Sequence, residues 1–345
     1  MSDLRRDPVS GNWVVISPGQ EAGVKLAPHP PFSTDADTCP FCPGHESATG
    51  HEILRYPTRH PPGKEDPWDL RVVPNRRPVL RTEETLEREG VGMFDRITGV
   101  GAHEIIIESP DHDKRLFNFS PSQYELVLSA WRHRIIDLFR DQRLRYVALF
   151  RNEGRRAGAR ISHPHSQLIA TPIIPVGIRN LLSEAREHYE NKERCVFCDL
   201  LDHEREEDLR VVTQNDGFLA FCPFASHFPF EIWVVPISHH HQFGAITDEQ
   251  ISLLSEIIVR LAKALSLSLL EPDLNLVLKT APNPSRKRKH WTTLEEDFHW
   301  HLELIPRISR PTGFETATGM FINPTPPEEA AAHLRGSLIQ NKDTQ

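Results

Sequence analysis

The sequence has no long apolar run, no secretory leader and no excess of positive charge. None of its hydrophobic stretches approaches the roughly 18 residues that a membrane-spanning helix needs. Its amino terminus, MSDLRRDPVSGNW, lacks the apolar core of a signal peptide. The formal net charge is −8 at pH 7, which argues against an obligate nucleic-acid-binding protein. We therefore expect a cytoplasmic protein with no membrane partner and no nucleic-acid partner.

Cysteine is scarce, but four of the five cysteines form two CxxC pairs, Cys39/Cys42 and Cys195/Cys198. In a reducing compartment such pairs indicate metal binding or redox chemistry rather than disulfides. A thioredoxin-like motif starts a helix after a strand, whereas the first pair lies among Pro, Gly and acidic residues. Ordinary buried thiols are the other interpretation, and the recurrence of the pair weakens it. The sequence favours two metal sites, with both pairs on loops beside the sheets.

The order of motifs is repeated along the chain, whose 345 residues are enough for two domains. Each CxxC pair is followed by a strand pattern ending in histidine, a helical apolar period, another strand pattern and an HxH motif. This recurrence indicates an internal duplication with a boundary between residues 170 and 191. It predicts an α+β fold in which each half is a mainly antiparallel sheet with a packed helix. The repeated segments are 101–113, 120–139, 146–154 and 163–175 in the first half, and 228–241, 247–265, 274–282 and 299–308 in the second.

The histidines near the first CxxC pair complete a set of zinc ligands. Zinc prefers four nitrogen or sulfur ligands in a tetrahedron, and Cys2His2 is a common set. Cys39 and Cys42 would be joined by His112 and by one of His163 and His165. From the residues alone, both choices for the fourth ligand remain open.

The second half offers a matching zinc set, whose histidines have near neighbours that also fit. No residue that would hold a substrate or a reactive water is evident around either set. Both zinc ions are therefore predicted to be structural. The matching set is Cys195, Cys198, His239 and His299, and the neighbouring histidines are His240, His241 and His301.

The motif HPHSQ, from His163 to Gln167, predicts chemistry as well as metal binding. Residues two apart on a strand point to the same face, so one histidine can bind metal and leave His165 free. A neutral imidazole is a good nucleophile toward phosphorus. The preceding segment, RNEGRRAGAR, supplies glycines that admit a phosphate and arginines that match its oxygens. Attack of His165 on a pyrophosphate, with Asn152 as an amide donor, is the predicted reaction. The cations offered for this site are Arg155, Arg156 and Arg160, and Gln167 is next in line on the face of the two histidines.

Several motifs along the chain match one known family. They are RRDPVSGNWVVISP, CPFC, RVVPNRRPVL, HEIIIESPDH, HPHSQ, PFEIWVVP and, near the carboxyl terminus, GFETATGMFINP. With them the sequence resembles the galactose-1-phosphate uridylyltransferase family, a transferase branch of the histidine-triad superfamily. The resemblance runs nearly end to end and implies two histidine-triad-like units. Residues 1–178 would form a catalytic half with the first zinc site, and residues 179–345 a second half with the other.

The resemblance also implies roles for individual residues. It implies that His165 is the nucleophile that forms a covalent nucleotidyl-histidine. It implies that Gln167 holds a non-bridging oxygen of the α-phosphorus, and that His163 is the fourth ligand of the first zinc, with Cys39, Cys42 and His112. Residues implied to line the nucleotide and its phosphates are Asn75, Asn152 and Gly158, and the pair implied to meet the sugar hydroxyls is Phe314 and Glu315.

The implied activity exchanges a nucleoside monophosphate between a nucleotide sugar and a hexose 1-phosphate. UDP-glucose and galactose 1-phosphate would give glucose 1-phosphate and UDP-galactose. Gln167 stands where hydrolases of the superfamily carry a third histidine, and an amide cannot relay a proton to water. The intermediate would therefore wait for a phosphate acceptor, with ping-pong kinetics. The resemblance further implies a homodimer.

Three departures from the family pattern bear on the substrate. Gln20 and Gly23 stand where arginines are expected, Arg160 stands where serine is usual, and Ser166 resembles the ADP-glucose phosphorylase branch. One alternative therefore keeps the enzyme class but uses an adenylyl donor, with inorganic phosphate or another sugar phosphate as acceptor. An alternative of another class is a zinc-stabilised nucleotide-binding protein without turnover. The intact nucleophile and amide argue against it.

Overall fold

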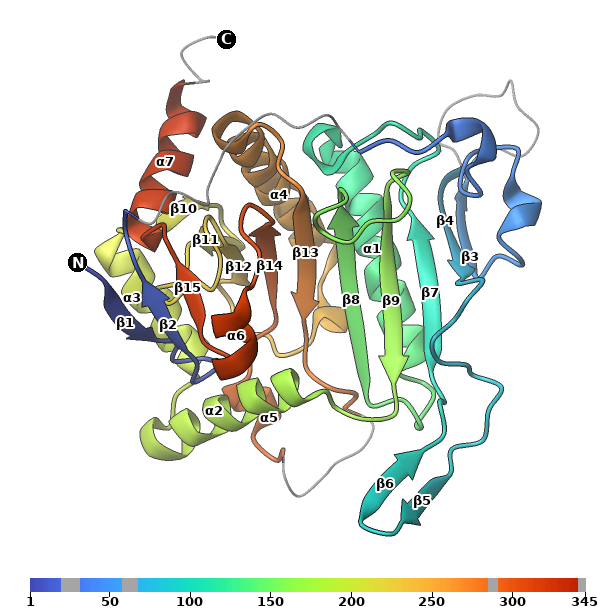
Figure 1. Ribbon diagram of the computed structural model, residues 1–345, viewed down its shortest axis with the longest axis horizontal. Coiled ribbons are helices and arrows are strands. Elements are labelled where there is room, and N and C mark those ends of the chain that lie inside the picture. The colour runs from blue at the N-terminus through green and yellow to red at the C-terminus, as the bar shows by residue number, and fades with distance from the viewer. Residues whose placement is uncertain (20–31, 58–67, 285–290, 341–345) are drawn as a thin grey trace.

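The chain builds one central ten-stranded sheet, in which every neighbouring pair of strands is antiparallel (Figure 1). The computed structural model describes residues 1–19, 32–57, 68–284 and 291–340. From one edge to the other the strands are β10 (Val211–Gln214), β11 (Phe218–Phe221), β12 (Ile232–Pro236), β14 (His301–Pro306), β13 (Leu274–Lys279), β8 (Tyr146–Glu153), β9 (His165–Thr171), β7 (Ala102–Ile107), β4 (Trp68–Pro74) and β3 (Leu54–Pro57).

The order of the strands shows the duplication directly. Read from its outer edge, the first half runs β3-β4-β7-β9-β8 and the second runs β10-β11-β12-β14-β13. The two halves meet where β8 pairs with β13, from Glu153 opposite Leu274 to Leu149 opposite Leu278. The predicted α+β class, with two similar mainly antiparallel units, is therefore confirmed. Both units share one continuous sheet.

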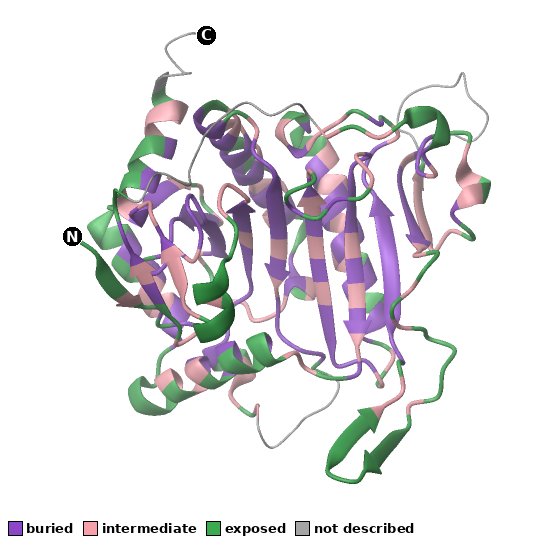
Figure 2. Ribbon diagram, in the orientation of Figure 1, coloured by how far each residue is buried: buried purple, intermediate pink, exposed green. Residues whose placement is uncertain are grey.

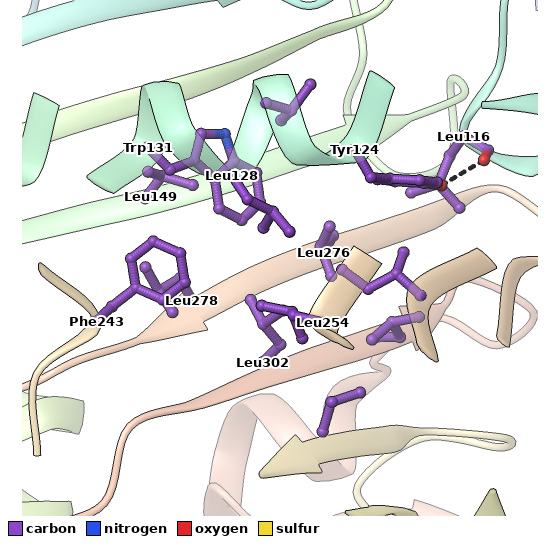
Figure 3. Close-up of a cluster of buried hydrophobic side chains, with 14 of the residues drawn as sticks. Leu116, Tyr124, Leu128, Trp131, Leu149, Phe243, Leu254, Leu276, Leu278 and Leu302 are labelled. Atoms are coloured by element: carbon purple, nitrogen blue, oxygen red, sulfur yellow. Dashed lines mark hydrogen bonds between the residues drawn. The ribbon is translucent and has the colours of Figure 1, made fainter. Parts of the chain in front are cut away.

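Two long helices cover one face of this sheet, α1 (Pro121–Leu138) and α4 (Asp248–Leu269) (Figure 1). The Ser120 side chain accepts from Gln123 N–H at the start of α1, and Thr247 and Gln250 form a capping box at the start of α4. Their apolar sides meet the sheet in the largest core cluster, where Trp131 of α1 lies near Leu149 and Leu128 (Figure 3). Each fully buried side chain of this kind stabilises the fold by roughly 1.5–3 kcal/mol.

The opposite face of the sheet carries the shorter elements. Strands β1 (Asp3–Arg6) and β2 (Trp13–Ile16) form a small sheet with β15 (Phe321–Asn323), so the first residues of the chain pair with some of the last. The hairpin of β5 and β6 projects from the body and is exposed (Figure 2). In the described part of the chain, no helix is both long and apolar enough to cross a membrane. The remaining helices and strands are β5 (Arg88–Val91), β6 (Phe94–Ile97), α2 (Val176–Lys192), α3 (Val196–Glu207), α5 (Leu294–Asp297), α6 (Gly313–Thr318) and α7 (Pro327–Gln340). Of these, α7 packs against α4 on the helix-covered face.

Candidate active site and metal centres

Cys39, Cys42, His112 and His163 lie together beside the first half of the sheet, with one ligand atom from each within 4.8 Å of the others. Cys42 Sγ is 3.2 Å from His112 Nδ1 and 3.6 Å from His163 Nδ1. The two nitrogens are 3.4 Å apart. A tetrahedral zinc ion, with bonds of about 2.0–2.3 Å, separates its ligand atoms by about 3.3–3.8 Å. The cluster therefore has the dimensions of a zinc site, and His165 is not part of it.

The protonation of this cluster also fits a metal cation. His112 Nε2–H donates to the carbonyl oxygen of Thr34 at 2.8 Å, and His163 Nε2–H to that of Ser109 at 2.7 Å. These bonds leave the Nδ1 lone pairs directed at the sulfur atoms. Burial lowers the pKa of His163 to about 4, so its ring is neutral, and burial raises the pKa of Cys42 to about 12. A bound cation would supply the positive charge that allows the thiols to ionise.

The second predicted set repeats this geometry. One atom each of Cys195, Cys198, His239 and His299 lies within 4.8 Å of the others. Cys198 Sγ is 3.4 Å from His239 Nδ1 and 3.9 Å from His299 Nδ1. The Nε2–H groups of the two histidines donate to backbone carbonyls at 2.9 and 3.0 Å. The structure thus brings all eight predicted metal ligands into two Cys2His2 clusters, while the neighbours His240, His241 and His301 lie outside both.

The location of the second CxxC pair differs from its prediction. Cys39 and Cys42 lie in turns, as expected, but Cys195 is the N-cap residue of α3 and Cys198 lies in its first turn. The prediction of a loop was wrong for this pair. The apolar spacing of Val196, Phe197 and Leu201, which are all buried, indicates the helix and was overlooked.

A cavity of about 270 Å³ lies beside the first cluster and is lined by both His163 and His165. His165 is the first residue of β9 and is only 8 % exposed. Its Nδ1–H donates to the carbonyl oxygen of His163 at 2.8 Å, so the lone pair is on Nε2. Burial lowers the pKa of His165, which keeps the ring neutral, and the ring of Phe41 packs against it at 5.2 Å between centroids. This imidazole is oriented and protonated as a nucleophile requires.

Buried ion pairs fix the wall of this cavity. Arg151 pairs with Glu108 and, at 2.6 Å, with Glu153. Arg115 pairs with Glu153 at 3.0 Å and with Glu271 at 2.8 Å. Buried charges persist only when they are paired in this way. The network joins β8 to the segment after β7, which brings Lys114 and Arg115 to the cavity lining. No local motif indicates this network, because the ion pairs that join its separate segments connect residues 38, 43 and 156 positions apart.

The glycine-rich segment after β8 brings fewer positively charged side chains to the cavity than the sequence predicted. Asn152 lines the cavity, and its Oδ1 accepts a hydrogen bond from Asn275 Nδ2 at 2.8 Å. Gly158 has a φ of +93°, and a Cβ atom there would lie 3.6 Å from Asn152 Nδ2. Arg160 is exposed and is absent from the described lining of the cavity. Exposed Arg155 stacks on Phe32 instead, at 4.7 Å from the ring centroid.

The remaining predicted residues divide into two groups. Gln167 and Asn75 both lie near the imidazole of His103: Gln167 Oε1 is 3.1 Å from His103 Nε2, and Asn75 Nδ2 is 3.0 Å from it. Phe314 and Glu315 belong to α6, which lies in front of the other half of the sheet (Figure 1). None of these four predicted residues is among the described residues that line the cavity. Gln20 and Gly23 lie outside the described residues.

Two family models match the chain. The family model for the galactose-1-phosphate uridyl transferase N-terminal domain matches residues 1–175. The chain belongs to the galactose-1-phosphate uridylyltransferase family. A second model, a domain of unknown function (DUF4921), matches residues 117–345. The match to this family makes the chain an enzyme of the uridylyltransferase and ADP-glucose phosphorylase group.

Individual relatives cover almost the whole chain. ADP-glucose phosphorylase from Arabidopsis thaliana is 31% identical over 339 residues, which are 96% of this chain and 92% of the relative. Galactose-1-phosphate uridylyltransferase from Thermotoga maritima is 29% identical over 348 residues. The match covers 99% of this chain and 100% of the relative. The crystal structure of the Arabidopsis phosphorylase with bound ADP-glucose superposes with a TM-score of 0.81 at 29% identity, covering 97% of this chain and 98% of that one.

Proposed function

We propose that the protein is a nucleotidylyltransferase that exchanges a nucleoside monophosphate between a nucleotide sugar and a hexose 1-phosphate through a covalent intermediate on His165. UDP-glucose and galactose 1-phosphate are the proposed pair. The observation that carries the proposal is the Nδ1–H of His165, which donates to the His163 carbonyl at 2.8 Å inside a cavity. The relatives named uridylyltransferase and ADP-glucose phosphorylase support a nucleotide sugar as the substrate class.

The proposed reaction has two displacements on the same phosphorus. Nε2 of His165 attacks the α-phosphorus, the bond to the bridging oxygen breaks, and the sugar 1-phosphate leaves with the electron pair. The ring then carries a positive charge, which the His163 carbonyl stabilises through Nδ1–H. A sugar phosphate needs little acid assistance to leave. Gln167 supports the non-bridging oxygens, and the incoming sugar phosphate reverses the sequence.

Zinc is the proposed metal for both Cys2His2 clusters. Four protein ligands close a tetrahedral zinc site, so these sites leave no position for a substrate. The first cluster has a direct structural consequence for the reaction, because His163 provides both a ligand atom and the carbonyl that holds His165. We propose on this basis that residues 1–178 form the catalytic half with the first zinc site, and residues 179–345 the half with the second zinc site.

A homodimer is part of the proposal. Phe314 and Glu315 match the family positions that meet the sugar hydroxyls, but α6 lies in front of the half of the sheet that lacks His165 (Figure 1). Strand β14 is separated from β9 by β13 and β8. Phe314 is 39 % exposed, although it is a large apolar side chain. A second copy of the chain would bring this pair to the cavity of the first.

An adenylyl donor remains the second candidate, because the Arabidopsis phosphorylase is 31% identical. Ser166, which resembles that branch, does not decide between the two donors. It is fully buried, and its Oγ accepts a hydrogen bond from Trp131 Nε1 at 2.9 Å on the helix-covered face of the sheet. Ser166 therefore supports the strand and lies away from the substrate.

The donor is tested by trapping the intermediate. Protein incubated with UDP-glucose or ADP-glucose, each labelled at the α-phosphorus, is expected to retain an acid-labile, base-stable label from its true donor. Galactose 1-phosphate should then discharge a uridylyl label, whereas discharge of an adenylyl label by phosphate would favour the second candidate. If neither donor labels the protein, the proposed transferase activity is wrong.

Lys114 is the cation that we expect to contact a substrate phosphate. It lines the cavity, and within the described part of the chain it forms no ion pair, whereas the neighbouring Arg115 is bound to Glu153 and Glu271. Replacing Lys114 by alanine is expected to raise the KM for the nucleotide sugar about tenfold, because a charge-assisted contact of about 1.4 kcal/mol is lost. Steady-state kinetics measure this effect. Exposed Lys192 at the end of α2 is the matched control, and an equal effect of Lys192→Ala would contradict the assignment.

A further inference from the structure

The side chain of Asn152 lies between the proposed nucleophile and the second half of the sheet. Arg151 is opposite Ser166 in the pairing of β8 with β9, so the next residues along, Asn152 and His165, are neighbours across the two strands. On its other side, Asn152 is directly opposite Asn275 of β13. Both Asn152 and His165 line the cavity. The Asn152 amide is therefore placed where the two halves meet, beside the imidazole that would attack phosphorus.

Two contacts fix the orientation of the Asn275 amide. Arg307 follows β14, and its Nε–H donates to Asn275 Oδ1. A guanidinium has donors only, so it can pair only with the oxygen of the amide. Asn275 Nδ2–H donates to the carbonyl oxygen of Ala157 at 2.9 Å, and a carbonyl can pair only with the nitrogen. The oxygen and the nitrogen of this buried amide therefore cannot exchange places.

The fixed amide of Asn275 in turn fixes that of Asn152. Asn275 Nδ2–H donates to Asn152 Oδ1 at 2.8 Å, and a half-turn of the Asn152 amide would bring two NH2 groups together. Asn152 Nδ2 is therefore directed away from β13. Gly158 leaves that side open, because even a Cβ atom there would lie 3.6 Å from Nδ2. Among the residues that the structure describes, none accepts a hydrogen bond from Nδ2, so its N–H groups remain for a phosphate oxygen.

Strand β13 also holds the glycine-rich segment that follows Asn152. Asp273 Oδ2 accepts from the backbone N–H of Arg156 at 2.6 Å. Gly154, which lines the cavity, has a φ of +84°, and a Cβ atom there would overlap the Asp273 carboxylate. The backbone N–H of Arg307 donates to the Asp273 carbonyl oxygen at 2.7 Å. The second half of the chain therefore shapes one wall of the cavity in the first half.

We propose that Asn275, held by Arg307, is a positioning residue, which fixes the Asn152 amide with its donors directed toward a phosphate of the nucleotide sugar. This inference rests on the proposed transferase function. A preorganised N–H stabilises the negative charge on the oxygens around the reacting phosphorus, and a carbonyl oxygen in its place would repel that charge. The second half thus takes part in the reaction by orienting a hydrogen-bond donor of the catalytic half.

Asn275→Asp tests this role, because it changes the hydrogen bonds at nearly constant volume. A carboxylate only accepts, so Arg307 keeps its partner while the Asn152 amide is expected to turn and direct its oxygen into the cavity. Single-turnover labelling of the protein at saturating α-labelled donor should slow about ten- to one-hundred-fold. The donor concentration that gives half the maximal rate should change less, because the lost interaction is strongest in the transition state.

The double variant separates orientation of Asn152 from the added charge. In an Asn152→Ala background, Asn275→Asp should slow labelling by less than about twofold, because the amide that Asn275 orients is absent. The same slowing in both backgrounds would contradict the positioning role, since a negative charge near the phosphate or a general structural effect acts without Asn152.

Two further outcomes distinguish this inference from the function on which it rests. If the wild type is not labelled by either nucleotide sugar, the proposed function has failed. If the wild type is labelled and Asn275→Asp is labelled equally fast, the function stands and the positioning role is wrong. Should Asn275→Asp not fold, Asn275→Ser, whose hydroxyl is too short to reach Asn152 Oδ1, takes its place in each comparison.

Discussion

His165→Ala is expected to lower the rate of nucleotidyl transfer by about 10⁴–10⁶-fold while the chain remains folded. The substitution removes the nitrogen that would form the bond to phosphorus, and no other imidazole among the described residues lining the cavity is free to replace it. His112 and His163 direct their Nδ1 atoms into the Cys2His2 cluster, and their Nε2–H groups donate to carbonyl oxygens. Labelling of the protein by α-labelled nucleotide sugar should disappear. Circular dichroism and zinc content should stay unchanged.

The duplicated half supplies a matched control for this variant. His301 begins β14 as His165 begins β9, and its Nδ1 lies 3.5 Å from the carbonyl oxygen of His299. Glu303 follows in place of the glutamine, the ring of Trp233 stacks on His301 at 4.8 Å, and His301 is completely buried. A carboxylate would repel a phosphate, so this position cannot support the same reaction. The His301→Asn protein should therefore still be labelled by the α-labelled nucleotide sugar. If His301→Asn is not labelled but His165→Ala is, the catalytic half is the second and not the first.

The two Cys2His2 clusters could be predicted from the sequence because metal chemistry restricts the residue types of such sites and because the pattern occurs twice. The choice between His163 and His165 could not be made from spacing alone, since both lie on the same short segment. The structure separates them: β9 begins at His165, while His163 precedes the strand and is fixed by the Ser109 carbonyl. A backbone acceptor leaves no trace in the local sequence.

The residues around His165 were harder to predict because they meet through strand pairing. His103 and Gln167 are 64 positions apart, and only the register of β7 with β9 brings them together. For the positively charged residues of the cavity, closeness to His165 along the chain was a poor guide. Arg155 and Arg160 are near His165 in the chain but exposed in the structure, whereas Lys114, which is farther away, lines the cavity.

Removing a ligand of the first metal cluster is expected to have the second-largest effect. The wild type should contain about two zinc ions per chain, one for each Cys2His2 cluster. Cys42→Ser should bind one, and its labelling rate should fall about one-hundred-fold, because loss of the ion frees His163 and with it the carbonyl that holds His165 Nδ1–H. Metal analysis and single-turnover labelling measure the two effects on the same sample.

Two cysteine variants test whether this effect depends on which metal is lost. Cys198→Ser should also lose one zinc ion, but the cluster that it disrupts holds His299 and not the nucleophile, so labelling should remain within about tenfold of the wild type wherever the chain stays folded. Cys222 is buried and belongs to neither cluster, so Cys222→Ser should keep both ions. A Cys42→Ser protein that retains two zinc ions would refute the first site. Equal losses of labelling in Cys42→Ser and Cys198→Ser would show that both ions act only through the stability of the shared sheet. A loss specific to Cys42→Ser would locate the coupling in the segment from the proposed metal ligand His163 through Pro164 to the proposed nucleophile His165.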